Sequence, residues 1–370
     1  MTVPAEEGAA PIATAPRSRL VAYLTRTSKG GYAVETREAR NGRVHWRSQP
    51  WSPPSPPDGT AEGWTVPGLA VLTDRGREYV TAYAYGERRP GDPSVAVVSY
   101  RADASGRAVA PTTAADVPVT GAPESINADG TALVVRMEGT TASVAVATGT
   151  VHIYKGSERE CTACADRMVA VVPKGPVLTS SANGYEVAGA WSSAQVTPPE
   201  YKTRLAELEG ITADYLIGSW RAPADFDEAR WVVHDAESGK ALAAVTCSVP
   251  GNGTRRQLYT PHTSANGRYL VAGPVAFDLG HARGVCLDGG NDGDPVEFTA
   301  VDDDGLAFGT SAPQQGSDEP GRPVQVPLET GKPKTLVAGT LVPVAMVDGR
   351  GVFAAPAGEQ DVRLTAYPRF

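Results

Sequence analysis

Clustered basic residues and long apolar runs are both missing from this sequence. Its 370 residues include 34 Lys and Arg against 42 Asp and Glu, a net charge of -8, and the pI is near 5.3. Nucleic acids and anionic membrane surfaces both attract clustered positive charge, so neither is expected as a partner. Apolar runs such as Met168–Val172 are far shorter than the roughly 20 residues that cross a bilayer, so no membrane span is expected in this chain.

Signatures of common active sites are also missing. The sequence contains no G-x-S-x-G, H-E-x-x-H or G-x-x-x-x-G-K pattern, and no G-x-G-x-x-G pattern after a predicted strand. Only five histidines occur, and scattered histidines are more often surface or core residues than metal ligands or catalytic bases. A non-catalytic role is therefore favoured, and no catalytic residue is assigned.

Cysteine is scarce, with four residues: Cys161, Cys164, Cys247 and Cys286. A small even number permits two disulfides. We expect Cys161 to pair with Cys164, and Cys247 with Cys286 because each of these two ends a repeat and neighbouring outer strands would bring them together. Four buried thiols are the alternative. The C-x-x-C pair also fits a redox centre or half of a zinc site, although the sequence shows no helix start beside it and no second C-x-x-C.

What the sequence does contain is a repeated tight turn followed by a short apolar strand. The clearest copy is Ser264–Gly273 (SANGRYLVAG), and Ser181–Gly189 (SANGYEVAG) closely matches it. Asn-Gly and Asp-Gly accept the positive φ angles of such turns, and the branched and aromatic residues that follow favour a strand. Looser copies occur at Thr73–Val80, Asn127–Val135, Asp303–Phe308 and Asp348–Phe353.

Most of the remaining chain also predicts short strands joined by turns. Leu20–Leu24, Tyr32–Thr36 and Val44–Trp46 predict an antiparallel meander of three strands. Glu200–Glu209 is the one segment with helical character, and it fits either a short helix that ends at Gly210 or a polar strand. Helices therefore make up little or none of the predicted fold.

The spacing of the repeats predicts the fold class. Many short strands without alternating helices indicate a propeller, a sandwich or a barrel, and the repeat favours the propeller. We count seven units of about 53 residues, or eight if the stretch around Tyr215 is separate. The prediction is an all-β, seven-bladed β-propeller of four-stranded antiparallel sheets, with eight blades possible, as a single domain over residues 20–370. Residues 1–19, rich in Pro and Ala, are predicted to be a flexible tether.

The repeat also resembles a known family. The phrase S-x-[ND]-G-x-x-[LY]-x-V, followed by a strand and a D-x-x-[ST]-G hairpin at Asp235–Gly239, is similar to secreted bacterial β-propellers of the WD40-like and TolB-like kind. The Trp-Asp dipeptides of true WD40 repeats are missing. The bias toward Ala, Gly, Arg and Thr resembles that of actinobacterial proteins. The resemblance implies a propeller and an exported protein, and it implies little about function.

An oxygen-rich loop is a candidate metal site. Asp288, Asn291, Asp292 and Asp294 lie in a stretch punctuated by glycine, and calcium prefers several carboxylate and carbonyl oxygens on a sharply turning backbone. The stretch has neither the spacing nor the closing Glu of an EF-hand, and a solvated turn is the alternative. No cofactor is assigned from the sequence, with calcium at this loop as the possible exception.

Aromatic side chains near a Pro-rich loop are a candidate binding patch. Trp51 and Trp64 flank that loop, and Tyr83 and Tyr85 lie on the following strand. Aromatic residues are effective anchors at interfaces. If these four side chains are exposed together, they would form a recognition surface.

The predicted function is that of a non-catalytic binding or scaffold module. It would recognise a protein or a small ligand through the top-face loops of the propeller, as a monomer. The alternatives are a propeller-type hydrolase or lyase, in which His234, His262 and His281 would meet at the axis, and the sensor domain of an envelope signalling protein. The tether and the cysteines favour an extracellular or envelope-attached protein whose signal or anchor precedes this chain, and a cytoplasmic protein is the second option.

Overall fold

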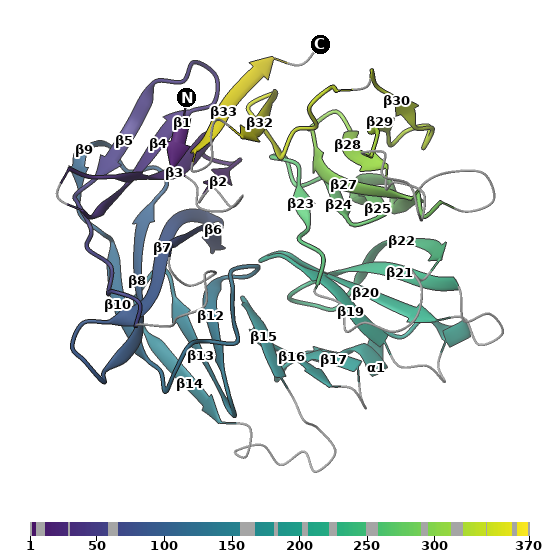
Figure 1. The fold of residues 1–370 in the computed structure, drawn as a ribbon. Coiled ribbons are helices and arrows are strands. Elements are labelled where there is room, and N and C mark those ends of the chain that lie inside the picture. The colour runs from purple at the N-terminus through teal and green to yellow at the C-terminus, as the bar shows by residue number, and fades with distance from the viewer. Residues whose placement is uncertain are drawn as a thin grey trace. The chain divides into compact units, whose positions relative to one another are not determined.

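Strands make up almost all of the regular structure in the described part of the chain (Figure 1). The computed structural model describes residues 2–4, 12–28, 30–57, 66–155, 167–180, 184–201, 206–221, 228–248, 258–289, 295–311, 321–337, 339–356 and 361–368. The chain divides into two compact units, residues 1–176 with 354–366 and residues 177–353 with 367–370. The single domain over residues 20–370 remains a prediction.

The first unit contains three complete sheets. Its strands are β1 (Thr2–Pro4), β2 (Ile12–Ala15), β3 (Leu20–Arg26), β4 (Tyr32–Glu38), β5 (Val44–Ser48), β6 (Gly68–Asp74), β7 (Arg77–Glu87), β8 (Pro93–Arg101), β9 (Gly106–Val109), β10 (Thr113–Pro118), β11 (Ser125–Asn127), β12 (Ala132–Met137), β13 (Thr140–Ala145), β14 (Val151–Lys155), β15 (Arg167–Val172) and β33 (Asp361–Pro368). The sheet orders are β2-β3-β4-β5-β9, β6-β7-β8-β10 and β11-β12-β13-β14. All neighbours pair antiparallel except β5 and β9, which pair in parallel.

The second unit repeats the same plan. Its strands are β16 (Gly175–Ser180), β17 (Gly184–Val187), β18 (Trp191–Ser192), β19 (Ala206–Ile211), β20 (Tyr215–Arg221), β21 (Glu228–Asp235), β22 (Ala241–Ser248), β23 (His262–Thr263), β24 (Tyr269–Ala272), β25 (Val275–Asp278), β26 (Arg283–Cys286), β27 (Val296–Val301), β28 (Leu306–Ser311), β29 (Pro323–Pro327), β30 (Lys334–Thr335), β31 (Ala345–Val347) and β32 (Arg350–Pro356). Strands adjacent in sequence pair antiparallel in β19–β22, β23–β26 and β27–β30.

Tight turns with positive φ angles join several neighbouring strands. Arg75 and Gly76 connect β6 to β7 with φ angles of 47° and 75°, and Asp348 and Gly349 connect β31 to β32 with φ angles of 51° and 67°. Two consecutive positive φ angles are typical of the type I′ turn, whose twist matches that of the paired strands. The turns predicted at these two positions are confirmed.

An eight-stranded sheet in the second unit consists of two four-stranded meanders. The meanders are β19–β22 and β23–β26, and their outer strands β22 and β26 pair in parallel at Ala244 and Arg283. Three residues further along both strands, Cys247 and Cys286 form a disulfide with Cα atoms 5.5 Å apart. The predicted pairing of these two cysteines between neighbouring outer strands is confirmed.

The two meanders of this sheet share one apolar core. Buried side chains from β20 to β25 pack together in a single cluster, which comprises Ile217, Ala229, Trp231, Val233, Ala243, Cys247, Leu270, Ala272, Val275 and Phe277. On the outer strands, a Cβ atom at Gly284 would lie 2.8 Å from the Cβ atom of Val245. Glycine is therefore what allows β26 to approach β22 so closely.

The sheets decide the fold class. The described strands form seven sheets, of which five have four strands, one has five and one has eight. Because the eight-stranded sheet holds two meanders of four strands, the described strands form eight units, seven of four strands and one of five. Eight is the second of the two predicted counts. Such a meander is the sheet of a propeller blade. The predicted class, an all-β β-propeller of four-stranded antiparallel sheets, is confirmed.

The N-terminal segment differs from its prediction. Thr2–Pro4 pairs with β33 as β1, and Ile12–Ala15 pairs with β3 as β2, from Ile12 opposite Tyr23 to Ala15 opposite Leu20. Within the tether predicted for residues 1–19, the described residues 2–4 and 12–15 are thus paired strands, and residues 5–11 lie outside the described residues. The small and branched side chains of Ile12–Ala15 are compatible with a strand, and pairing satisfies the backbone groups along the edge of β3.

Helices are few and short in the described residues. They are α1 (Ser193–Val196) and the 3₁₀ turns η3 (Pro199–Tyr201) and η4 (Leu279–His281). Of the two interpretations of Glu200–Glu209, the polar strand holds for its last four residues, which open β19. No helix in the described ranges is long and apolar enough to cross a membrane.

Candidate functional site

An apolar loop between β30 and β31 exposes three aliphatic side chains. The exposed fractions of Val337, Leu341 and Val344 are 80%, 51% and 40%. We define the apolar loop as residues 336–344, of which residue 338 lies outside the described residues. Neighbouring exposed apolar side chains mark surfaces that bind another molecule more often than single ones do. The apolar loop is therefore our first candidate for a binding surface.

Hydrogen bonds hold the apolar loop at both ends and inside. At its two ends, Leu336 N donates to Pro323 O and Val344 N donates to Val352 O, both at 2.8 Å. Inside the loop, Thr340 N donates to Val337 O at 3.0 Å. The hydroxyl of Thr299 donates to Pro343 O at 2.8 Å. A loop that is already ordered loses less conformational entropy when a partner binds. The exposed side chains are thus presented from a backbone that is fixed in advance.

Sequence reasoning missed this loop because its residues are those of a strand. The stretch from Leu336 to Val347 is almost entirely apolar, and a short apolar run indicates a buried strand. Only its last three residues form one, β31. Gly339, with a φ angle of 82°, and Pro343, which has no N–H to donate to a ladder, were the signals that could have shown a loop.

A charged cluster at the end of β25 is a second candidate. The buried carboxylate of Asp278 accepts a hydrogen bond from Arg268 Nε at 3.0 Å, and its Oδ2 lies 2.7 Å from His281 Nδ1 and 3.5 Å from Arg283 Nη2. Asp278 also accepts from the backbone N–H of His281 and so caps η4. Two partly exposed guanidinium groups therefore lie against one buried carboxylate.

The electrostatics of this cluster keep Asp278 ionised. Burial by itself would raise its pKa, but hydrogen bonds and positive charge from Arg268 and His281 lower the pKa well below its usual range. Arg268 also stacks over the ring of Tyr269, with its guanidinium carbon 4.8 Å from the ring centre. In the described residues, no hydroxyl or thiol forms a hydrogen bond with His281, so the cluster does not have the arrangement of a nucleophile and its base.

The three histidines named for an axial active site lie in different surroundings. His234 is buried, with its ring centre 5.6 Å from that of Trp191 and 5.5 Å from that of Trp220. Burial lowers the pKa of His234 and lowers that of His262 to about 4, so both are neutral at pH 7. His281 is exposed in the charged cluster. In the described residues no hydrogen bond links any two of them, and the enzymatic alternative gains no support.

The three described residues of the predicted aromatic patch are not exposed together. Trp51 and Tyr85 are buried, and Tyr83 is half-buried. Trp51 belongs to an apolar cluster built from β3, β7 and β8, and its backbone pairs with Tyr32. Tyr85 packs beside β12 and β13. Their large apolar rings stabilise these cores more by burial than they would on the surface.

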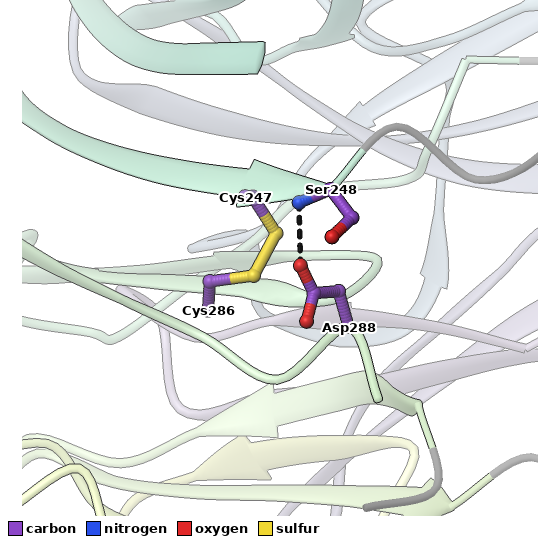
Figure 2. The surroundings of a disulfide bond; sticks show 4 residues. All are labelled: Cys247, Ser248, Cys286 and Asp288. Atoms are coloured by element: carbon purple, nitrogen blue, oxygen red, sulfur yellow. Dashed lines mark hydrogen bonds between the residues drawn. A yellow bond between two sulfur atoms is a disulfide. The ribbon is translucent and has the colours of Figure 1, made fainter. Parts of the chain in front are cut away.

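Several predicted site residues lie outside the described residues, namely Trp64, Cys161, Cys164, Asn291, Asp292 and Asp294. Of the predicted calcium ligands, only Asp288 is described. Its Oδ2 accepts a hydrogen bond from Ser248 N, directly beside the disulfide (Figure 2). The calcium site and the pairing of the two cysteines of the C-x-x-C motif remain predictions.

The sulfur atoms of the disulfide and a carboxylate oxygen of Asp288 form a compact group. The Sγ atoms of Cys247 and Cys286 and one oxygen of Asp288 all lie within 4.8 Å of one another (Figure 2). Metal ions bind the thiolate form of cysteine. In the oxidised state the sulfur atoms are joined to each other, and the group is a structural link between β22 and β26.

Comparisons with known proteins add similarity of structure but not of sequence. No protein-family model and no curated protein matches this chain. The structure of U3-55K is 9% identical over 95% of this chain and 90% of its own, with a TM-score of 0.36. The Neurospora crassa Pan2 WD40 domain is 11% identical over 64% and 73%, with a TM-score of 0.31. A polysaccharide lyase, the PL25 ulvan lyase, is 8% identical over 99% and 94%, with a TM-score of 0.38.

Proposed function

We propose that this protein is a non-catalytic binding module that works outside the cytoplasm and recognises a partner protein through the apolar loop. The observation that carries the proposal is the exposure of Val337, Leu341 and Val344 on a backbone held by hydrogen bonds. Propellers present their variable binding residues on the loops that join successive blades, and the apolar loop joins two successive meanders. An exposed, preorganised apolar surface suits a protein better than a small polar ligand.

The proposed location rests on the disulfide. Cys247 and Cys286 are bonded in the structure, and disulfides persist in oxidising compartments and are rare where thiols are kept reduced. The disulfide joins two four-stranded meanders, so it stabilises the contact between two sheets and is not confined to a surface loop. Both features support a protein that matures outside the cytoplasm.

Substitution of the apolar loop tests the proposed function. The variant carries Val337→Ser, Leu341→Ser and Val344→Ser, and its matched control carries Val44→Ser and Ile153→Ser, two exposed aliphatic residues of the first unit. Each protein is immobilised and exposed to an envelope fraction of the source cells, and the proteins retained are compared by mass spectrometry.

We expect the unaltered chain and the control to retain the same partner and the apolar-loop variant to lose it. Exposed side chains contribute little to folding, so all three proteins should have the same circular dichroism spectrum. Their free energies of unfolding should agree within a few tenths of a kcal/mol. Equal retention by the apolar-loop variant would show that this loop is not the binding surface.

A further inference from the structure

We propose that the reduced form of this protein binds one thiophilic divalent cation, of the Zn²⁺ class, through Cys247, Cys286 and Asp288. The donor atoms of these three residues already lie within 4.8 Å of one another. The oxidised protein cannot use this group, because its sulfur atoms are bonded to each other. Reduction of the disulfide therefore exchanges a covalent link for a metal site at the same place.

The donor set suits zinc. Two thiolates and a carboxylate are ligands that Zn²⁺ commonly takes, with bonds near 2.3 Å to sulfur and about 2.0–2.2 Å to oxygen. Tetrahedral geometry then needs sulfur atoms about 3.8 Å apart, which side-chain rotation provides once the bond between them is broken. Calcium prefers oxygen ligands only, so this site differs in chemistry from the calcium site predicted around Asp288.

The backbone holds the two cysteines in place without the disulfide. They lie on β22 and β26, which pair in parallel at Ala244 and Arg283 and approach closely at Gly284. Cys247 belongs to the apolar core that takes side chains from both meanders. These contacts do not depend on the bond between the sulfur atoms, so reduction leaves the thiols as neighbours.

The third ligand is held in position as well. Asp288 follows β26 by two residues, and its Oδ2 accepts a hydrogen bond from the backbone N–H of Ser248, the residue next to Cys247 (Figure 2). Carboxylates that bind metals are usually oriented by such a hydrogen bond from the surrounding protein. Cys286 and Asp288 are half-buried and Cys247 is buried, so a small reductant and a metal ion can approach from the side of Cys286.

The chemical step is an ordinary thiol–disulfide exchange followed by metal binding. Two equivalents of a monothiol, or one of a dithiol, supply two electrons and two protons, which gives the thiols of Cys247 and Cys286 and the disulfide of the reductant. Each thiol then releases its proton as the cation binds. Water completes the coordination that three protein ligands leave open. The cation thereby restores a link between β22 and β26 under reducing conditions.

A cadmium titration tests the proposal. The full chain carries Cys161→Ser and Cys164→Ser, so that the C-x-x-C motif cannot supply thiolates. The protein is reduced, freed of reductant without oxygen, and titrated with Cd²⁺ while the thiolate-to-cadmium charge-transfer absorption is recorded. We expect saturation at one Cd²⁺ per chain, displacement by Zn²⁺, no effect of excess Ca²⁺, and no absorption with the oxidised protein.

Two variants in the same background separate the proposed site from adventitious thiolate binding. Asp288→Asn should weaken Cd²⁺ binding at least about tenfold. Loss of a residue that only orients a metal ligand already lowers metal affinity 10- to 100-fold, and Asp288 is itself a proposed ligand. Asp92→Asn, at an exposed turn of the first unit, should leave the affinity unchanged. Equal affinity of the Asp288→Asn variant, absence of the absorption, or loss of the β-sheet circular dichroism spectrum on reduction would each overturn the proposal.

Discussion

Removal of the disulfide between Cys247 and Cys286 should lower stability by an amount that the chain itself predicts. The two residues are 39 positions apart, and the entropy of closing a loop of that length in the unfolded chain is worth about 4 kcal/mol at 25 °C. Folded domains are typically stable by 5–15 kcal/mol. The protein should therefore stay folded without the bond but unfold at a clearly lower denaturant concentration.

Urea unfolding followed by tryptophan fluorescence measures this loss. Trp231 is buried in the same apolar core as Cys247, so the emission of the chain's six tryptophans includes a signal from the relevant sheet. With a urea dependence of about 3 kcal/mol per molar, a loss of about 4 kcal/mol lowers the midpoint by roughly 1.3 M. We expect this shift both in the Cys247→Ala/Cys286→Ala variant and in the unaltered chain after reduction in the absence of metal.

The reduced chain is the matched control because it loses the bond but keeps both sulfur atoms. A shift in the alanine variant alone would assign the loss to packing around Cys247, since removal of buried atoms has its own cost. A shift below roughly 0.3 M in both proteins, equivalent to about 1 kcal/mol, would refute the loop-closure argument. The unfolded chain would then already be constrained in this region.

Three further outcomes follow from local geometry. Gly239→Ala should lower the free energy of unfolding, measured in urea, several times more than Gly189→Ala. Both glycines have positive φ angles, but only at Gly239 would an added Cβ atom meet the Trp191 ring, at 2.7 Å. Burial lowers the pKa of His262 to about 4, so the unaltered protein should lose stability as the pH falls from 6.5 to about 4, because the unfolded chain binds the proton more readily. His262→Gln should abolish this part of the loss, and the urea midpoint of the variant should then depend less on pH in this range. Asp278→Asn should lower the thermal midpoint more at pH 7 than at pH 2, because the pKa of Asp278 lies well below its usual range and its contribution, fully present above about pH 4, shrinks as the pH falls toward that lowered pKa.

Local sequence was sufficient for most of the turns and strands. Arg75-Gly76 and Asp348-Gly349 form the tight turns expected of them, because the preference for positive φ angles belongs to the residues themselves. The alternation of turn and apolar run likewise predicted four-stranded antiparallel sheets, since each run needs a neighbour to pair with. The fold class followed from these short-range signals together with their repetition.

Segments whose composition suits more than one structure depended on their neighbours. Ile12–Ala15 has the small residues of a linker, and it is a strand because the edge of β3 is available to pair with it. Ala206–Ile211 is strand β19 because it pairs with β20. Leu336–Val344 has the composition of a strand, yet it is a loop whose hydrogen bonds run largely to residues outside it. Contacts with neighbouring elements, which the composition of the segment itself does not reveal, decided each case.

The candidate sites show the same division. The sequence alone predicted that Cys247 would meet Cys286, because the repeat places both at the ends of outer strands. That Asp288 joins them depended on a hydrogen bond to Ser248, and that Asp278 gathers two arginines and a histidine depended on the turn after β25. Sequence determines which residue types and which local turns are present. The distances between side chains are set only when strands pair, because pairing fixes the register and spacing that single-strand patterns do not contain.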